Sequence, residues 1–438
     1  MRETRANMIR HLQNPHPILV ARFAALGLRR LAATLILPVV LFVLPIAVRA
    51  QQALSLADAD QRGANFFTQS AVTGMVLVVV RNHEVMIGGY GETFPGSGTK
   101  PDANSLLRLC SISKVFTGDL LIGLSAEGKV GLSDPLQHYA PRGKLVPVGP
   151  GGQPMMLRDL ATHTSGLARE VGTYSAKTPH FTFPDQAYRW TWLPRQMLTR
   201  APGTAALYSN AGFDLLGDAL ASAAGKPYAQ LLNERIARPL GLRDTTLTPS
   251  KDECARLLRG SGDEGPCTDT QASGASGGVY STGADMARVL AYLLHIPGVP
   301  AQPAAALAVY LRPDQLRSMQ GLSHAGDPTG IGLGWIQLGD PNSPSALMEK
   351  TGGGAGFSTY IALSPKQQTG IFLAVTEGKG DAQVDFYQEA NNLLAALANV
   401  PPVPPKAHVA RTARKRHPRR KTHTSSAEQQ THGSSVHR

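Results

Sequence analysis

Two pairs of β-rich segments, one near each end of the body of the chain, constrain its fold most. Val72 to Arg81 and Glu84 to Tyr90 are joined by Asn82-His83, which is typical of a hairpin. A second pair of such segments lies at 356–363 and 370–376. The simplest fold that uses both pairs is an antiparallel sheet made from both ends of the body and flanked by helices.

Helical patterns accompany these strands. Apolar spacing predicts helices at about 55–69 and 381–398, and helical stretches punctuated by Gly and Pro dominate 130–330. We therefore predict an α/β fold with an inserted, mainly helical region. The predicted boundaries are 51–399 for the folded domain, 51–129 and 331–399 for its α/β part, and 130–330 for its helical part.

The charge of the chain lies at its ends. The 438 residues carry a formal charge of +12, but residues 1–50 hold seven basic and one acidic residue, and 406–438 hold nine basic and one acidic. Residues 51–405 keep a formal charge of −2, so nucleic acid is not an expected partner of the body. A hydrophobic content of 42% supports a large core and excludes a disordered chain or a fibre.

The first 50 residues have the pattern of a secretory signal peptide. Basic residues precede an 18-residue apolar stretch, Leu31 to Val48, and small residues follow it. This order predicts export to the bacterial periplasm with cleavage after Ala50. An uncleaved anchor in the inner membrane is the alternative, because 18 apolar residues are near the lower limit for a bilayer span.

The last residues, 400–438, differ in composition from the body. Prolines come first, and seven basic residues follow between Arg411 and Lys421. Such a segment has too little apolar surface to offset its ordering entropy, so we predict a disordered basic tail. A solvated tail without a dedicated partner is the simplest interpretation. The alternative partners are anionic membrane lipids or wall polymers.

The three cysteines agree with export. Cys254 and Cys267 flank a short polar loop that a disulfide could close. Cys110 is then unpaired in an apolar segment, where a free cysteine is usually a small buried hydrophobic residue.

Ser111 and Lys114 open a helical pattern that continues to Glu127. A spacing of three on a helix places the two side chains together, so a neutral lysine could take the proton of the serine hydroxyl. Burial or a neighbouring cation would favour the neutral lysine. A Ser-x-x-Lys match is weak by itself, because roughly one is expected by chance in a chain of this length.

Tyr208-Ser209-Asn210 precedes a helical run. The phenol could relay a proton if nearby lysines stabilise its anion, and the Asn210 amide could hold a substrate carbonyl. For the tripeptide alone, an ordinary turn with Asn210 as the helix cap is the simpler interpretation.

Lys350-Thr351-Gly352, continued by Gly353, precedes the strand at 356–363. A cation and a hydroxyl suit a carboxylate, and glycine lets a ligand approach the backbone closely. A phosphate-binding loop is the alternative, but the motif lacks a following helix.

The three motifs in this order resemble the serine β-lactamase and penicillin-binding protein superfamily. The likeness covers about 55–398. The chain is most similar to the class C group and, within it, to the AmpH type of D-alanyl-D-alanine carboxypeptidase and endopeptidase. Further stretches that carry the likeness are Tyr90-Gly91-Glu92-Thr93, Asp134-Pro135-Leu136, 157–167 and 276–282.

The resemblance implies acyl transfer without a cofactor. Ser111 would be the nucleophile, Lys114 its base partner, and Tyr208 the proton relay to the leaving amine. Asn210 would orient the acyl side of the substrate. Backbone N–H groups of Ser111 and Gly353 would form the oxyanion hole.

On the other side of the site, Lys350, Thr351 and Gly352 would bind the terminal carboxylate of a substrate. The resemblance thus implies cleavage of D-Ala-D-Ala-type bonds in peptidoglycan stem peptides, with covalent penicillin binding. A class C-like β-lactamase and a penicillin-binding sensor that does not turn over are the alternatives. Lys350 argues against an esterase, because a cation suits an anionic substrate better than a neutral ester.

Two competing motifs are rejected. Gly274 to Gly278 fits the Gly-x-Ser-x-Gly elbow of hydrolases, with His163 as the base, but the segment before it is polar rather than a buried strand. We interpret His163 as a turn histidine bonded to the backbone. The sequence contains neither His-Glu-x-x-His nor Cys-x-x-Cys, so no metal is expected.

Overall fold

The computed structural model describes residues 53–173, 175, 177–262 and 265–406. The predicted cleavage after Ala50 and the basic run from Arg411 to Lys421 lie outside these residues. Within the described ranges, no helix has the length and apolar character that a membrane span requires.

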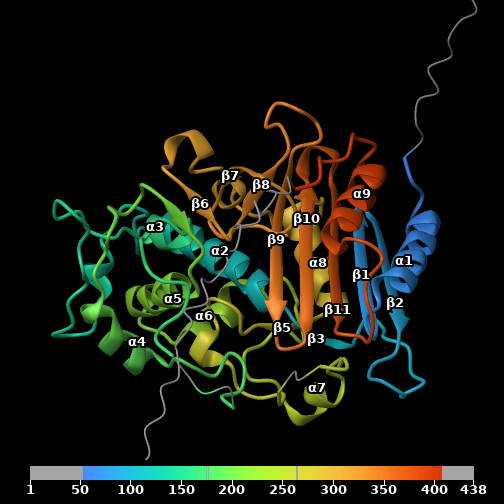
Figure 1. Ribbon diagram of the computed structural model, residues 1–438, viewed down its shortest axis with the longest axis horizontal. Helices are drawn as coiled ribbons and strands as arrows, with labels where there is room; N and C mark the ends of the chain where they lie inside the picture. Colours follow the sequence, from blue (N-terminus) through green and yellow to red (C-terminus); the bar gives the residue numbers. More distant parts are fainter. Residues whose placement is uncertain (1–52, 174, 176, 263–264, 407–438) are drawn as a thin grey trace, which may run out of the picture. The chain divides into compact units, whose positions relative to one another are not determined.

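A seven-stranded antiparallel sheet joins segments from both ends of the body (Figure 1). The strand order is β2-β1-β11-β10-β9-β8-β7. The hairpin of β1 (Gly74–Arg81) and β2 (Glu84–Gly91) pairs with β11 (Thr369–Thr376), where Leu77 faces Leu373. The predicted sheet architecture is therefore confirmed.

Three strands that the sequence pattern did not indicate complete the sheet beside β10 (Phe357–Ser364). They are β7 (Pro328–Ile331), β8 (Ile336–Leu338) and β9 (Leu347–Gly354). The Lys-Thr-Gly motif therefore lies inside β9 and not in a loop before a strand. Its glycines have low strand propensity, but pairing with β10 satisfies the backbone groups.

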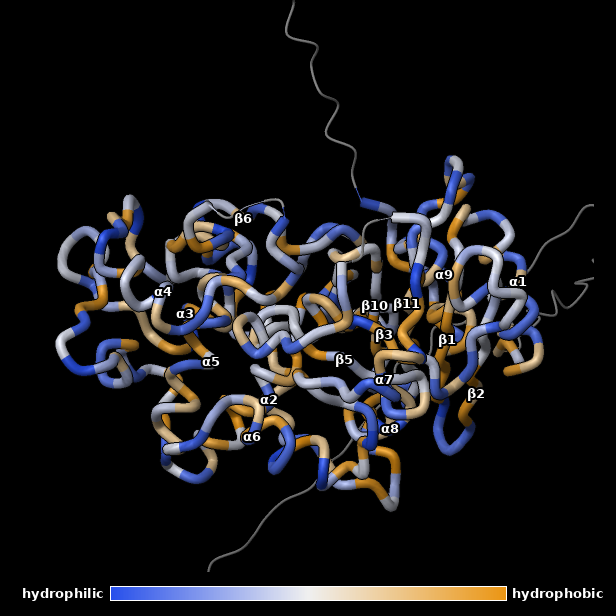
Figure 2. The backbone as a smooth tube through the Cα atoms, turned by 90° about the horizontal axis from the view of Figure 1, so that it is seen from below, coloured by the Kyte–Doolittle hydropathy of each residue, from blue (hydrophilic) through white to orange (hydrophobic). Residues whose placement is uncertain are grey.

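The side chains of β1 alternate between two buried cores. Val76, Val78 and Val80 belong to the core that contains residues of α8 (Gly283–Leu293). Met75, Leu77 and Val79 belong to the core under α1 (Leu56–Ser70) and α9 (Phe386–Ala398). A strand covered on both faces is a continuous apolar run, and β1 and β11 accordingly carry hydrophobic, orange stretches in Figure 2.

The helix α8 packs against β1 and β11, although its residues fall within the predicted inserted region. The boundaries predicted from composition therefore do not match the packing, because a segment's place in the sequence does not decide which surface its apolar face covers. The described elements of the region 130–330 also include α3 (Leu157–Ala161), α4 (Gln186–Trp192), α5 (Asn210–Ala224), α6 (Tyr228–Leu232) and α7 (Lys251–Ala255).

One short strand pair links this region to the sheet-containing part, because β3 (Leu106–Arg108) pairs antiparallel with β5 (Tyr280–Thr282). A second pair lies within the region, where β4 (Ala206–Leu207) and β6 (Met319–Gln320) are parallel. The helix α2 (Ser113–Ala126) lies between the sheet and α5 (Figure 1). These contacts bring segments from 110, 210 and 350 together.

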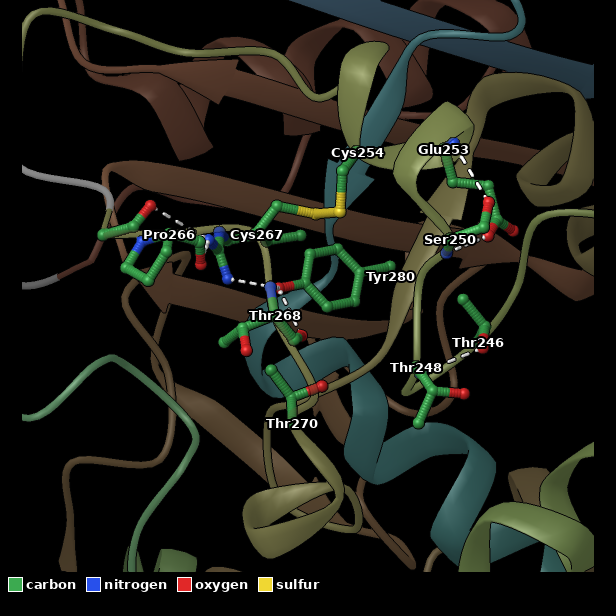
Figure 3. Close-up of a disulfide and its surroundings, with 12 residues drawn as sticks. Thr246, Thr248, Ser250, Glu253, Cys254, Pro266, Cys267, Thr268, Thr270 and Tyr280 are labelled. Carbon is green, nitrogen blue, oxygen red and sulfur yellow. Dashed lines mark hydrogen bonds between the residues drawn. A yellow bond between two sulfur atoms is a disulfide. The ribbon is translucent and has the colours of Figure 1, made fainter.

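A disulfide between Cys254 and Cys267 ties α7 to the segment that follows it. Figure 3 shows the ring of Tyr280 close to this bond. The Tyr280 hydroxyl accepts a hydrogen bond from the Arg108 guanidinium, 2.8 Å away, which joins β5 to β3 beside the disulfide. Cys110 is a free and buried thiol.

The first residues of the predicted tail are part of the fold. The Val403 side chain is buried in the core under α9, and its carbonyl accepts a hydrogen bond from Gln388. The Lys406 ammonium donates to the Ser323 carbonyl at 2.6 Å. The prediction that disorder begins at residue 400 was therefore wrong for 400–406, because an apolar side chain and a lysine anchor this segment.

Candidate active site

Ser111 lies in a short turn, Cys110–Ile112, directly before α2, and Lys114 lies in the first turn of that helix. The Lys114 ammonium is 3.2 Å from the Ser111 hydroxyl oxygen. It also donates to the Asn210 amide oxygen at 2.7 Å and to the Ser276 carbonyl at 2.5 Å. The predicted neighbours Ser111 and Lys114 are therefore in hydrogen-bond contact.

Lys114 is fully buried, and burial lowers its pKa to about 7. The carboxylates of Asp214 and Glu170 oppose this shift, because negative charge favours the ammonium form. An amine with this pKa is partly neutral near pH 7, so it can both accept and return the Ser111 proton.

Tyr208 also contacts Ser111. It lies between the end of β4 and Ser209, the residue that caps α5. The Tyr208 hydroxyl donates to Ser111 at 2.5 Å. The Ser209 hydroxyl caps the helix by accepting the Gly212 N–H, so the cap is Ser209 and not Asn210. The Asn210 side chain is thereby free to reach Lys114.

Three cations surround the ring of Tyr208. Lys114 and Arg169 lie 4.8 Å from its centroid, and Lys350 lies 5.2 Å away. The Tyr208 ring therefore lies against side chains that can carry positive charge, while its hydroxyl contacts Ser111.

The Lys-Thr-Gly motif approaches from β9. This strand pairs with β8 only at Leu347–Glu349, so no described strand covers its edge from Lys350 to Gly354 on that side. A Cβ on Gly352 would lie 2.8 Å from the Leu109 carbonyl and 3.1 Å from the Ser111 nitrogen, so only glycine fits there. Gly352 thus lets the open edge of β9 lie against the Ser111 turn.

Two acidic residues also belong to the site, and no sequence motif indicated them. Glu170 accepts a hydrogen bond from the Asn210 amide at 2.7 Å, which turns the amide oxygen towards Lys114. Asp214 accepts the Ser276 backbone N–H at 3.1 Å and is fully buried, so burial raises its pKa. Asp214 lies one turn after Asn210 on α5, a spacing that could have indicated it.

The rejected motifs have structural places in this site. The Ser276 hydroxyl contacts its own turn at Ser273, while the Ser276 carbonyl accepts from Lys114. His163 is buried, and its Nδ1 accepts the Ser209 N–H at 3.0 Å, which confirms a turn histidine bonded to the backbone. Burial lowers the pKa of His163 well below its usual value, so the ring is neutral.

Ser111, Asn210, Gly353 and Asp214 line one pocket of about 150 Å³. Among the described residues, no group of three or more His, Cys, Asp or Glu side chains is arranged to hold a metal ion. The contacts of Ser111 with an amine and a phenol are those that an activated serine nucleophile requires.

A model of the beta-lactamase family matches residues 56–397. The chain belongs to the beta-lactamase family. The predicted family resemblance is confirmed, and the chain is a hydrolase of the group that contains β-lactamases and DD-peptidases.

Relatives in the beta-lactamase family include the D-alanyl-D-alanine-carboxypeptidase/endopeptidase AmpH of Escherichia coli K12. It is 40% identical over 347 residues, which cover 78% of this chain and 90% of AmpH. A beta-lactamase/D-alanine carboxypeptidase from Yersinia pestis, solved in complex with citrate, is 39% identical with a TM-score of 0.73. The match covers 79% of this chain and 99% of that one.

The D-alanine carboxypeptidase AmpC from Burkholderia cenocepacia shares the fold at 23% identity, with a TM-score of 0.61. That match covers 78% of this chain and 98% of the other. The predicted antiparallel sheet flanked by helices is thus the fold of this family.

Proposed function

We propose that the protein is a serine DD-carboxypeptidase and endopeptidase that cleaves D-Ala-D-Ala-type bonds of peptidoglycan stem peptides. The observation that carries this proposal is the contact of Ser111 with both Lys114 and Tyr208. These residues lie beside β9, which contributes the cation Lys350 and an edge that no described strand covers. The likeness to AmpH supports the substrate class.

In the acylation step, Ser111 attacks the scissile carbonyl carbon while Lys114 takes its proton. Backbone N–H groups of Ser111 and Gly353 bind the carbonyl oxygen as it becomes negative, which is worth about 3 kcal/mol per donor. The C–N bond then breaks, and Tyr208 gives its proton to the leaving amine. The products are an ester on Ser111, an ammonium on Lys114 and a phenolate on Tyr208.

In the deacylation step, the Tyr208 phenolate takes a proton from water as the water oxygen attacks the ester carbon. Cleavage of the ester bond returns Ser111, which recovers its proton from Lys114. All protons are balanced over the cycle, so no cofactor is needed. Lys350 and Thr351, with the backbone at Gly352, hold the terminal carboxylate, and Asn210 orients the acyl side.

A class C-like β-lactamase is the second candidate, because the Yersinia pestis relative bears both names. The two reactions share the acyl-enzyme and differ in how fast water removes it. A penicillin-binding sensor would stop at the acyl-enzyme.

Digestion of purified muropeptides, analysed by chromatography beside a chromogenic cephalosporin assay, tests the proposal. We expect release of D-Ala or cleavage of cross-links, with slow cephalosporin hydrolysis. Fast cephalosporin turnover with inert muropeptides would identify a β-lactamase, and covalent labelling without turnover would identify a sensor.

The assignment of the nucleophile has a matched control. Ser111→Ala should abolish covalent labelling by fluorescent penicillin, because no other hydroxyl is paired with Lys114 among the described residues. Ser276→Ala removes a serine hydroxyl in the same pocket and should leave labelling intact. Labelling of the Ser111→Ala variant would disprove the assignment.

We further propose export to the periplasm, with a signal peptide at 1–50 and a catalytic domain that begins at Gln51. The disulfide supports an oxidising compartment. Mass spectrometry of the exported form should find Gln51 as its first residue, whereas an intact N-terminus in the membrane fraction would indicate an anchor. The basic tail would contact anionic lipids or wall polymers by charge.

A further inference from the structure

The pocket that Ser111 lines is also lined by a segment that the proposed mechanism does not use. Phe181 belongs to this segment, which precedes α4 and lines the pocket together with Ser111 and Gly354. The ring is half-buried and packs against the larger core. Its backbone has φ of +65°, a conformation that a bulky residue adopts only when its surroundings impose it.

The Phe181 ring lies between two backbone segments of the site. A Cβ on Gly277 would come within 2.7 Å of the ring, and a Cβ on Gly354 would lie 3.5 Å from it. Gly277 follows Ser276, whose carbonyl binds Lys114, and Gly354 ends the open edge of β9. The ring therefore spans the distance between the two sides of the pocket.

Hydrogen bonds to the segment on either side of the ring hold it in place. The Phe181 carbonyl accepts the Ser273 N–H at 3.3 Å, and the Phe183 carbonyl accepts the Ser273 hydroxyl at 3.2 Å. The Pro184 carbonyl accepts from Arg189 at 2.8 Å, and Arg189 is itself paired with Asp218. These bonds fix the backbone that carries the ring, and packing against the core holds the ring itself.

The direction of the substrate follows from the proposed function. With the terminal carboxylate at Lys350 and the scissile carbonyl beside Ser111 and Gly353, the acyl group continues along β9 towards Gly354. Phe181 stands at that end of the strand. An acyl group that is broad close to its carbonyl would occupy the volume of the ring.

We infer that the Phe181 ring is the wall at the end of the pocket where the acyl group of the substrate binds. It selects acyl groups that extend away from Ser111 as a narrow chain. A peptide stem meets this requirement, and a β-lactam with a large branched side chain does not. This inference rests on the proposed function, because it needs Ser111 to be the acylated residue.

The test compares two penicillins that share one nucleus, benzylpenicillin with its slim side chain and piperacillin with its bulky branched one. Second-order rate constants for acylation are measured in the wild type and in Phe181→Ala. We expect the piperacillin constant to rise about 10-fold or more relative to that of benzylpenicillin, since a single methylene that a pocket cannot fit already costs about 10-fold or more.

Two further variants keep the test decisive. Phe94→Ala removes an exposed aromatic ring that does not line the pocket. It should leave the ratio of the piperacillin and benzylpenicillin rate constants unchanged. Phe181→Leu keeps an apolar side chain and should give a smaller rise, which decides the matter if Phe181→Ala does not fold.

An unchanged ratio in folded Phe181 variants that still react with benzylpenicillin would overturn the end wall and leave the proposed function standing. A wild type that benzylpenicillin does not acylate would overturn both.

Discussion

The imidazole of His163 stacks on the phenol ring of Tyr208, with the ring centroids 4.4 Å apart and the planes inclined by 28°. The same imidazole accepts the backbone N–H of Ser209. His163 therefore touches the proposed proton relay and fixes the backbone that follows it. A neutral ring suits both contacts, because a proton on Nδ1 would remove the acceptor.

His163 should act as a positioning residue for Tyr208. His163→Phe keeps a stacked ring but leaves the buried Ser209 N–H without its acceptor, at a cost of about 1–3 kcal/mol. His163→Asn can keep an acceptor and tolerates the φ of +60° at this position, but it loses the stack. We expect both variants to acylate roughly 10-fold more slowly, with little change in KM for a peptide substrate. If both variants acylate at the wild-type rate, His163 has a packing role only.

Acylation should depend on pH through Lys114. Burial lowers the pKa of this amine to about 7, and only its neutral form can take the Ser111 proton. The neutral fraction, and with it the rate of acylation by benzylpenicillin, should rise about 10-fold from pH 6 to pH 8. Stopped-flow measurements check this expectation. Lys114→Arg stays charged throughout and should remain inactive, whereas a flat profile in the wild type would contradict the assignment of Lys114 as the base.

The buried pair of Arg189 and Asp218 should be important for stability. Both side chains are less than a tenth exposed, and Arg189 binds Asp218 through two nitrogens at 2.6 Å. Arg189→Leu leaves the carboxylate buried without its cation, so we expect the free energy of unfolding to fall by about 3–5 kcal/mol. Chemical denaturation measures this change. Lys226 and Glu234 form a matched pair at the surface, with Lys226 exposed, and Lys226→Leu should cost less than about 1 kcal/mol.

Two truncated chains should show which part of the C-terminal segment contributes to stability. A chain that ends at Lys406 keeps Val403 in its core and should match the full chain in stability and in turnover of small substrates. A chain that ends at Val400 loses that buried side chain, which is worth about 1.5–3 kcal/mol, and should melt at a lower temperature. Equal melting temperatures of the two chains would show that residues 401–406 contribute nothing to stability. Any effect of removing 407–438 should appear as salt-sensitive binding to anionic membranes or wall material.

The sequence by itself determined the strands and helices whose apolar pattern is long. The run from Met75 to Val80 is buried on both faces, so its continuous apolar pattern identifies it without knowledge of its neighbours. The site motifs were also visible, because the chemistry restricts each position to particular side chains. Ser111, Lys114, Tyr208 and Lys350 were found in this way and lie close together in the structure.

Tertiary structure decided what sequence spacing does not encode. Glycines with low strand propensity became part of β9 because pairing with β10 satisfies their backbone groups, and 400–406 became ordered because Val403 is covered. Glu170 and Phe181 join the pocket from a segment without a periodic pattern. Their place depends on contacts with residues 40 to almost 175 positions away, as from Glu170 to Asn210 and from Phe181 to Gly354, and local propensity carries no information about contacts over such separations.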